Sequence, residues 1–115
     1  MTILQRLKLE LSNKDYYTDE EYSMFLEENR LRPDDEYSKY DDQTRLLETV
    51  VSILETLAND VDLMRKIDSK DIISTEQAIK YLSLRIDTLN KKIIDLKEEN
   101  DEYISSNIRP IFYTR

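Results

Sequence analysis

The sequence contains no glycine, cysteine, histidine or tryptophan, and it has 2 prolines among its 115 residues. Phosphate-cradling loops of the P-loop and dinucleotide-binding types need glycine, because their backbone approaches the ligand closely or takes a positive φ. Without cysteine there are no disulfides, zinc thiolates or thiol nucleophiles, and without histidine the usual general base is missing. We therefore expect no enzymatic activity and no catalytic, cofactor or metal site.

Long hydrophobic runs are also lacking. No stretch approaches the roughly 20 apolar residues of a transmembrane helix, so we expect no membrane association and a protein that is soluble in the cytoplasm when made. The net charge of −8 argues against tight wrapping of nucleic acid, which depends on lysine and arginine. The acidic charge is uneven, because residues 13–42 hold 4 basic and 11 acidic residues. Length and composition fit a single domain over residues 1–115.

Two apolar seams with heptad spacing cover about half of the chain. The first comprises Leu47, Val50, Leu54, Leu57, Val61 and Met64, and the second comprises Ile79, Leu82, Ile86, Leu89, Ile93 and Leu96. Alternating steps of three and four place each set on one helical face. They predict helices over residues 44–66 and from Ser74 to about Tyr103. The connection between them is short, which favours an intramolecular antiparallel pair; an intermolecular coiled coil is the alternative.

Two shorter helices are predicted before the seams. Residues 3–11 form an amphipathic helix that Thr2 caps. Thr18 to Glu21 is a capping box that opens a helix to about Arg30, with Tyr17 placed to pack on Tyr22. Pro33 breaks this helix, and residues 34–42 are predicted to form an acidic turn or a single helical turn. The predicted fold is all-α, a small bundle of about four helices with one long antiparallel pair.

Carboxylates are the remaining candidates for chemistry. The acidic turn lacks the glycine of an EF-hand loop, so we interpret it as a solvated surface and not as a calcium site. Residues 98–102 resemble the Glu-Glu-x-x-Glu pattern of all-α nucleotide pyrophosphohydrolases. That family also needs a second acidic pair, Glu-x-x-Asp, on a facing helix, and the chain has none there. Five of the eight tyrosines lie in the acidic third, where core-edge and interface roles are both open.

The C-terminal segment is more apolar than expected for a chain end that makes no contacts. Pro110 is expected to mark the end of the last helix, which makes residues 103–115 an extended tail. The predicted interface residues of this tail are Ile108, Arg109, Ile111, Phe112, Tyr113 and Arg115. We expect the tail to dock on its own domain, on a neighbouring subunit or on a sheet edge.

The order of these elements, with an acid-led second helix Thr-Asp-Glu-Glu-Tyr-Ser-Met-Phe-Leu-Glu-Glu-Asn, resembles the head-tail connector (head completion) proteins of tailed bacteriophages. The resemblance covers nearly the whole chain, although the last helix is long for that family. It implies a structural virion protein, made in the host cytoplasm, that forms a homo-oligomeric ring between the portal protein and the next tail or stopper protein. DNA would pass through the ring without specific contacts.

An acidic lumen would suit such passage because it repels phosphate. A small helical adaptor or regulatory protein that binds a partner helix through its helical hairpin is the alternative interpretation. A metal-dependent nucleotide hydrolase is a third.

Overall fold

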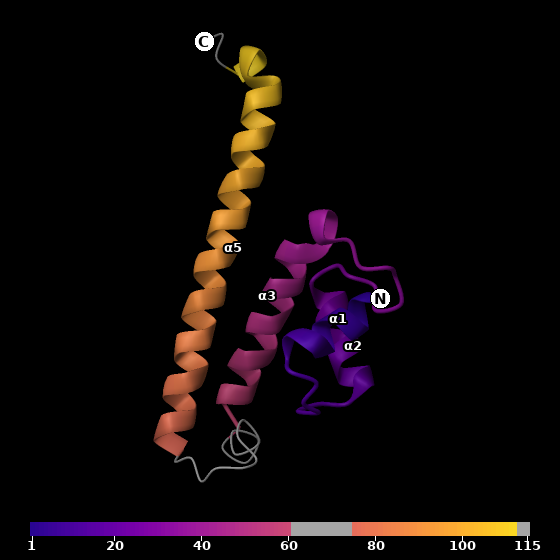
Figure 1. Ribbon diagram of the computed structural model, residues 1–115, viewed down its shortest axis with the longest axis vertical. Helices are drawn as coiled ribbons and strands as arrows, with labels where there is room; N and C mark the ends of the chain where they lie inside the picture. Colours follow the sequence, from indigo (N-terminus) through magenta and orange to yellow (C-terminus); the bar gives the residue numbers. More distant parts are fainter. Residues whose placement is uncertain (61–74, 113–115) are drawn as a thin grey trace.

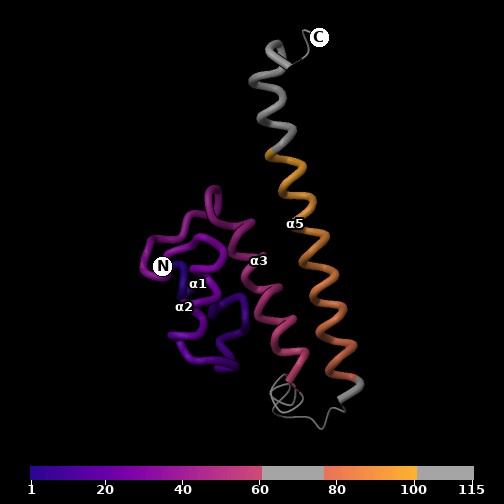
Figure 2. Tube along the Cα trace, turned by 180° about the vertical axis from the view of Figure 1, so that it is seen from behind, coloured from indigo at the N-terminus to yellow at the C-terminus, as the bar shows by residue number. Residues whose placement is uncertain are grey.

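Four α-helices form the regular structure of the described residues. The computed structural model describes the backbone of residues 1–60 and 75–112, and the side chains of residues 1–60 and 77–100. The helices are α1 (Ile3–Glu10), α2 (Asp19–Glu28), α3 (Lys39–Ala58) and α5 (Thr75–Phe112). α3 lies in the middle, with α5 antiparallel to it on one side and α1 and α2 on the other (Figures 1 and 2). The predicted all-α bundle with a long antiparallel pair is confirmed.

Both short helices begin at a threonine. The Thr2 hydroxyl accepts from the Gln5 N–H, and the Gln5 side chain accepts from the Thr2 N–H. Thr18 and Glu21 form the same reciprocal pair, as predicted, at 3.2 and 2.9 Å. Each box satisfies two backbone donors that a helix start leaves without a partner. Tyr17 also packs edge-on against Tyr22, with ring centroids 6.2 Å apart, which fixes the entry into α2.

The ends of α1 and α2 show how a chain without glycine closes its helices. Ser12 follows α1 with φ 60°, and Arg30 follows α2 with φ 65°. At the end of α2 the Leu31 N–H donates to the Leu26 carbonyl at 3.0 Å, and the Arg30 N–H donates to Glu27 at 3.0 Å. This is a Schellman motif, in which glycine is the usual residue at the left-handed position. In this chain a serine and an arginine take the left-handed conformation, which is strained for residues with a side chain.

α3 supplies the centre of the core. Its buried apolar side chains are Leu46, Leu47, Val50, Val51, Ile53, Leu54 and Leu57. They cover more than one face because α3 packs against α5 on one side and against α1 and α2 on the other. Thr49, also buried, donates its hydroxyl to the Arg45 carbonyl at 2.8 Å. Val61 and Met64 of the first predicted seam lie outside the described residues.

The second seam is shifted at its start. Leu82, Leu89 and Ile93 are buried and Ile86 and Leu96 are half-buried, but Ile79 is 45% exposed, so its expected burial is wrong. The buried position at this level belongs to Ala78. At about 100° per residue, four residues back from Leu82 leaves Ala78 about 40° from it, whereas three residues back leaves Ile79 about 60° away. A strict heptad drifts off the contact line of a straight helix in this way.

α3 begins earlier than predicted. It starts at Lys39, so Asp41 and Asp42 belong to its first turn and not to a separate acidic turn or single helical turn. The Asp42 carboxylate accepts from the Ser38 N–H at 2.9 Å, and carboxylates are favourable at a helix N-terminus. The helix ends at Ala58 instead of near residue 66.

The predicted extended tail is wrong as far as Phe112, because α5 continues to that residue. No glycine or proline interrupts the sequence between Leu96 and Pro110, and Pro110 removes a single N–H donor in the last turn of the helix. Ile108, Arg109, Ile111 and Phe112 of the predicted interface therefore lie on a helix, and their side chains fall outside the described ones. Tyr113 and Arg115 lie outside the described residues.

α5 is much longer than its partner. Its 38 residues correspond to about 57 Å, and the 20 residues of α3 correspond to about 30 Å. The C-terminal part of α5 consequently projects beyond the start of α3 (Figure 1).

Candidate interaction surfaces

The acidic residues of the N-terminal third are spread over the surface. Of the 11 acidic residues between positions 13 and 42, all but Asp42 are exposed. Glu36 forms an ion pair with the N-terminal amine at 3.0 Å, and Asp19 pairs with Lys8 at 2.6 Å. Among the side chains that the structure describes, no three acidic groups gather as metal ligands would. Glu98 and Glu99 of the Glu-Glu-x-x-Glu pattern are exposed, and the rest of its carboxylates fall outside the described side chains.

Buried polar groups give no sign of a small-molecule site in the described part of the chain. Each buried side-chain nitrogen or oxygen there has a hydrogen-bond partner. None of the described helices combines the length and apolar character needed to span a membrane.

The tyrosines of the acidic third, for which the sequence left core-edge and interface roles open, differ in burial. Tyr22 is buried: its hydroxyl donates to the Lys14 carbonyl at 2.8 Å and accepts from the Tyr16 and Tyr17 N–H groups at 3.1 and 3.4 Å. Burial, with a smaller contribution from nearby Tyr81, raises the pKa of Tyr16 to about 12. These tyrosines fix the α1–α2 loop. Tyr40, in contrast, is 83% exposed at the start of α3.

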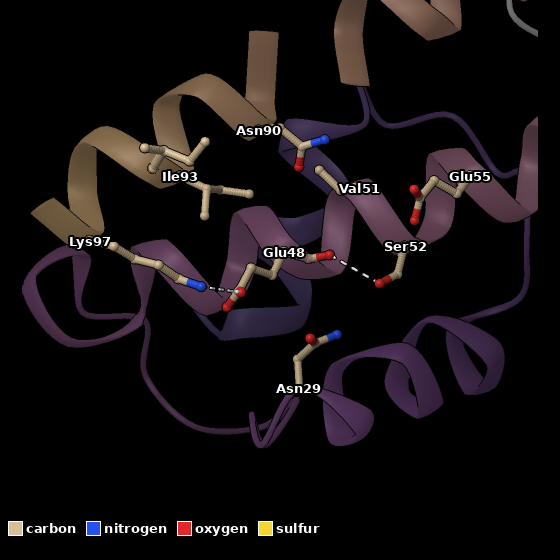
Figure 3. A pocket seen from close by; sticks show the side chains of 9 residues that line it. Asn29, Glu48, Val51, Ser52, Glu55, Asn90, Ile93 and Lys97 are labelled. Atoms are coloured by element: carbon tan, nitrogen blue, oxygen red, sulfur yellow. Dashed lines mark hydrogen bonds and ion pairs between the residues drawn. The ribbon is translucent and has the colours of Figure 1, made fainter. Parts of the chain in front are cut away.

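A groove runs between α3 and α5 (Figure 3). It has a volume of about 600 Å³. Its apolar floor is Val51 and Ile93, which are 8% and 6% exposed. The Lys97 ammonium bridges the two helices by pairing with the Glu48 carboxylate at 3.1 Å. The remaining lining residues are Asn29, Ser52, Glu55, Asn90 and Ile94. A short apolar floor between polar walls suits contact with another protein surface.

The opposite flank of α5 carries exposed apolar side chains. Leu84 is 70% exposed and Tyr81 is 51% exposed. With Arg85 and Thr88 they line a shallow hollow of about 280 Å³. Arg85 reaches from α5 to α1, where its guanidinium donates to the Glu10 carbonyl at 3.2 Å and lies 3.4 Å from the Glu10 carboxylate.

Sequence reasoning missed this flank because Tyr81 and Leu84 lie off the heptad seam. Ile94, 55% exposed, also lies off the seam on the groove side of α5. Their presence in the sequence was itself a signal, because a helix that packs along one seam usually carries polar residues on its other faces. α2 shows the same feature, with Met24 49% exposed among glutamates.

In comparisons with protein family models, with curated proteins and with solved structures, nothing matches this chain.

Proposed function

We propose that the protein is a structural virion component that assembles into a ring-shaped head-tail connector between the portal protein of a tailed bacteriophage and its next tail or stopper protein. In this role it is not an enzyme, binds no cofactor and allows DNA to pass without specific contacts. It would be made in the host cytoplasm and end in the virion.

The projection of α5 beyond α3 carries the proposal. A helix without tertiary packing is only marginally stable in water, so a long helix end beyond its intramolecular partner favours packing on another subunit. The element order supports the same role, because a short helix, an acid-led helix and two longer antiparallel helices follow one another as in the connector family. The net charge of −8 agrees with a channel to which DNA does not adhere.

The test is the oligomeric state of the full chain, alone and mixed with the portal protein encoded in the same genome. Mass photometry should detect a cyclic assembly, and negative-stain electron microscopy should show rings on the portal. A monomer or dimer that is indifferent to the portal protein over the micromolar range would contradict the proposal.

The groove between α3 and α5 favours a second candidate function, a small adaptor or regulatory protein that binds a partner helix. Val51 and Ile93 would receive apolar side chains of that helix, and Glu48 and Lys97 would meet its polar edge. A stable 1:1 complex with a host or phage protein, lost in Ile94→Glu at the exposed edge of the groove and formed without any ring, would favour this function over the connector.

A further inference from the structure

The outer flank of α5 combines exposed apolar side chains with positive charge. Tyr81 and Leu84 are exposed, and Lys91 and Lys92 lie two turns further along the same helix. Lys80 stands one turn before Leu84. The three lysines are exposed, and none forms an ion pair with another described residue. We call these five residues the α5 patch. Between residues 80 and 92 the helix has 4 cations and 1 carboxylate.

The exposed face of α2 has the complementary composition. Met24 lies at its centre, 49% exposed. Glu20, Glu21, Glu27 and Glu28 stand three or four residues away on both sides, so they surround it on the helix surface. All four are exposed. We call these five residues the α2 patch.

The two patches lie on helices that flank α3 from opposite sides (Figures 1 and 2). In the described part of the chain α2 and α5 do not pack against each other, and the reach of α5 toward this side goes to α1, where Arg85 contacts Glu10. An exposed apolar centre inside a charged rim is the usual anatomy of a protein interface, and opposite rims attract. Two α5 patches facing each other would bring lysines together, and two α2 patches would bring glutamates together. Self-pairing of either patch is thus disfavoured.

We propose that the α2 patch of one copy of this chain packs against the α5 patch of the next copy. Met24 then contacts Tyr81 and Leu84, and the glutamates pair with the lysines around them. Such a contact joins two different surfaces, so it is heterologous and repeats from copy to copy until the assembly closes into a ring. The inference rests on the proposed ring, for which it supplies the subunit contact.

Charge reversal tests the contact without disturbing the core. The first variant is Glu27→Lys/Glu28→Lys, in the last turn of α2, where cations suit the helix dipole. The second is Lys91→Glu/Lys92→Glu, at exposed positions where glutamate is a good helix former. Each variant alone should lose assembly in mass photometry, with self-association at least about tenfold weaker and helical circular dichroism unchanged.

An equimolar mixture of the two variants should assemble again, because each reversed patch meets an oppositely charged one on the other variant. The matched controls are Asp34→Lys/Asp35→Lys and Arg32→Glu/Lys39→Glu. They make the same changes in net charge outside both patches and should assemble as the wild type does.

Three outcomes would overturn the inference. A wild-type ring with reversed variants that assemble normally would refute this contact and leave the connector proposal standing. Loss of assembly without rescue on mixing would refute the pairing of these two patches. A wild-type chain that stays monomeric with and without portal protein would contradict both.

Discussion

Replacing Leu82 with alanine tests how α5 is rotated against α3. Leu82 is 1% exposed and belongs to the core cluster that α3 and α5 share. A buried leucine that becomes alanine loses its transfer free energy and leaves a cavity, so Leu82→Ala should lower the free energy of unfolding by about 3 kcal/mol, within a range of about 2–5. For a domain whose whole stability is on the order of 5–15 kcal/mol, this is a large fraction.

Ile79→Ala is the matched control. Ile79 lies one turn away on the same helix. Because it is 45% exposed, much of the side chain that alanine would remove already faces water. Its replacement should therefore lower the free energy of unfolding by less than about 1 kcal/mol. The strict heptad pattern makes the opposite prediction, because it places both residues in the seam.

Urea denaturation followed by far-UV circular dichroism measures both variants. With a slope of about 1–3 kcal/mol per M, Leu82→Ala should lower the midpoint by about 1–3 M, and Ile79→Ala should lower it by less than about a third of that shift. Equal shifts for the two variants would show that α5 presents the heptad face to α3. A wild-type midpoint for Leu82→Ala would show that the helices do not pack along this line.

Three further predictions concern single features. Arg30→Gly should raise the free energy of unfolding by about 0.5–1 kcal/mol, measured by urea denaturation, because it removes the left-handed strain of a residue with φ 65°; a loss of stability would contradict that reading of the α2 end. The pKa of Tyr16 is raised from 10.0 to about 12, so the contribution of its neutral hydroxyl to the free energy of unfolding is complete below pH 10 and is lost as pH rises toward 12. Tyr16→Phe should make the fall in stability between pH 10 and 12 less steep. A fall identical to that of the wild type would contradict this assignment to Tyr16. Deleting residues 110–115 should leave the melting temperature nearly unchanged and weaken ring formation or attachment to the portal protein; normal assembly would show that these residues are dispensable.

The capping boxes were predictable because their signal is local. Thr18 and Glu21 are three residues apart, and the reciprocal bonds between them need nothing beyond a helix start. The Tyr17–Tyr22 contact follows from the same geometry. Such features depend on sequence neighbours alone, so a pattern of residue types is sufficient to find them.

The seam on α5 was predictable in its middle and not at its start. Burial there depends on how α5 crosses α3. A straight helix rotates slowly away from a strict heptad repeat, and at this level the rotation brings Ala78 instead of Ile79 onto the line of contact. The small Ala78 lets the helices approach closely, a property that a search for large apolar residues overlooks. The predicted end of α5 was wrong for another reason. Pro110 was given more weight than the long stretch without glycine or proline that precedes it.

The interaction patches could not be read from periodicity, and the reason is physical. Single exposed apolar side chains are common on soluble proteins, so neither Leu84 nor Met24 alone indicates a contact. What distinguishes them is the sign of the charge around each, lysine in one case and glutamate in the other. Which lysines share a face with Leu84 away from the core becomes known only once α5 is fixed against α3. The interface hypothesis therefore depends on the packing of α5, and it would have to change if the Leu82 and Ile79 variants showed a different rotation of that helix.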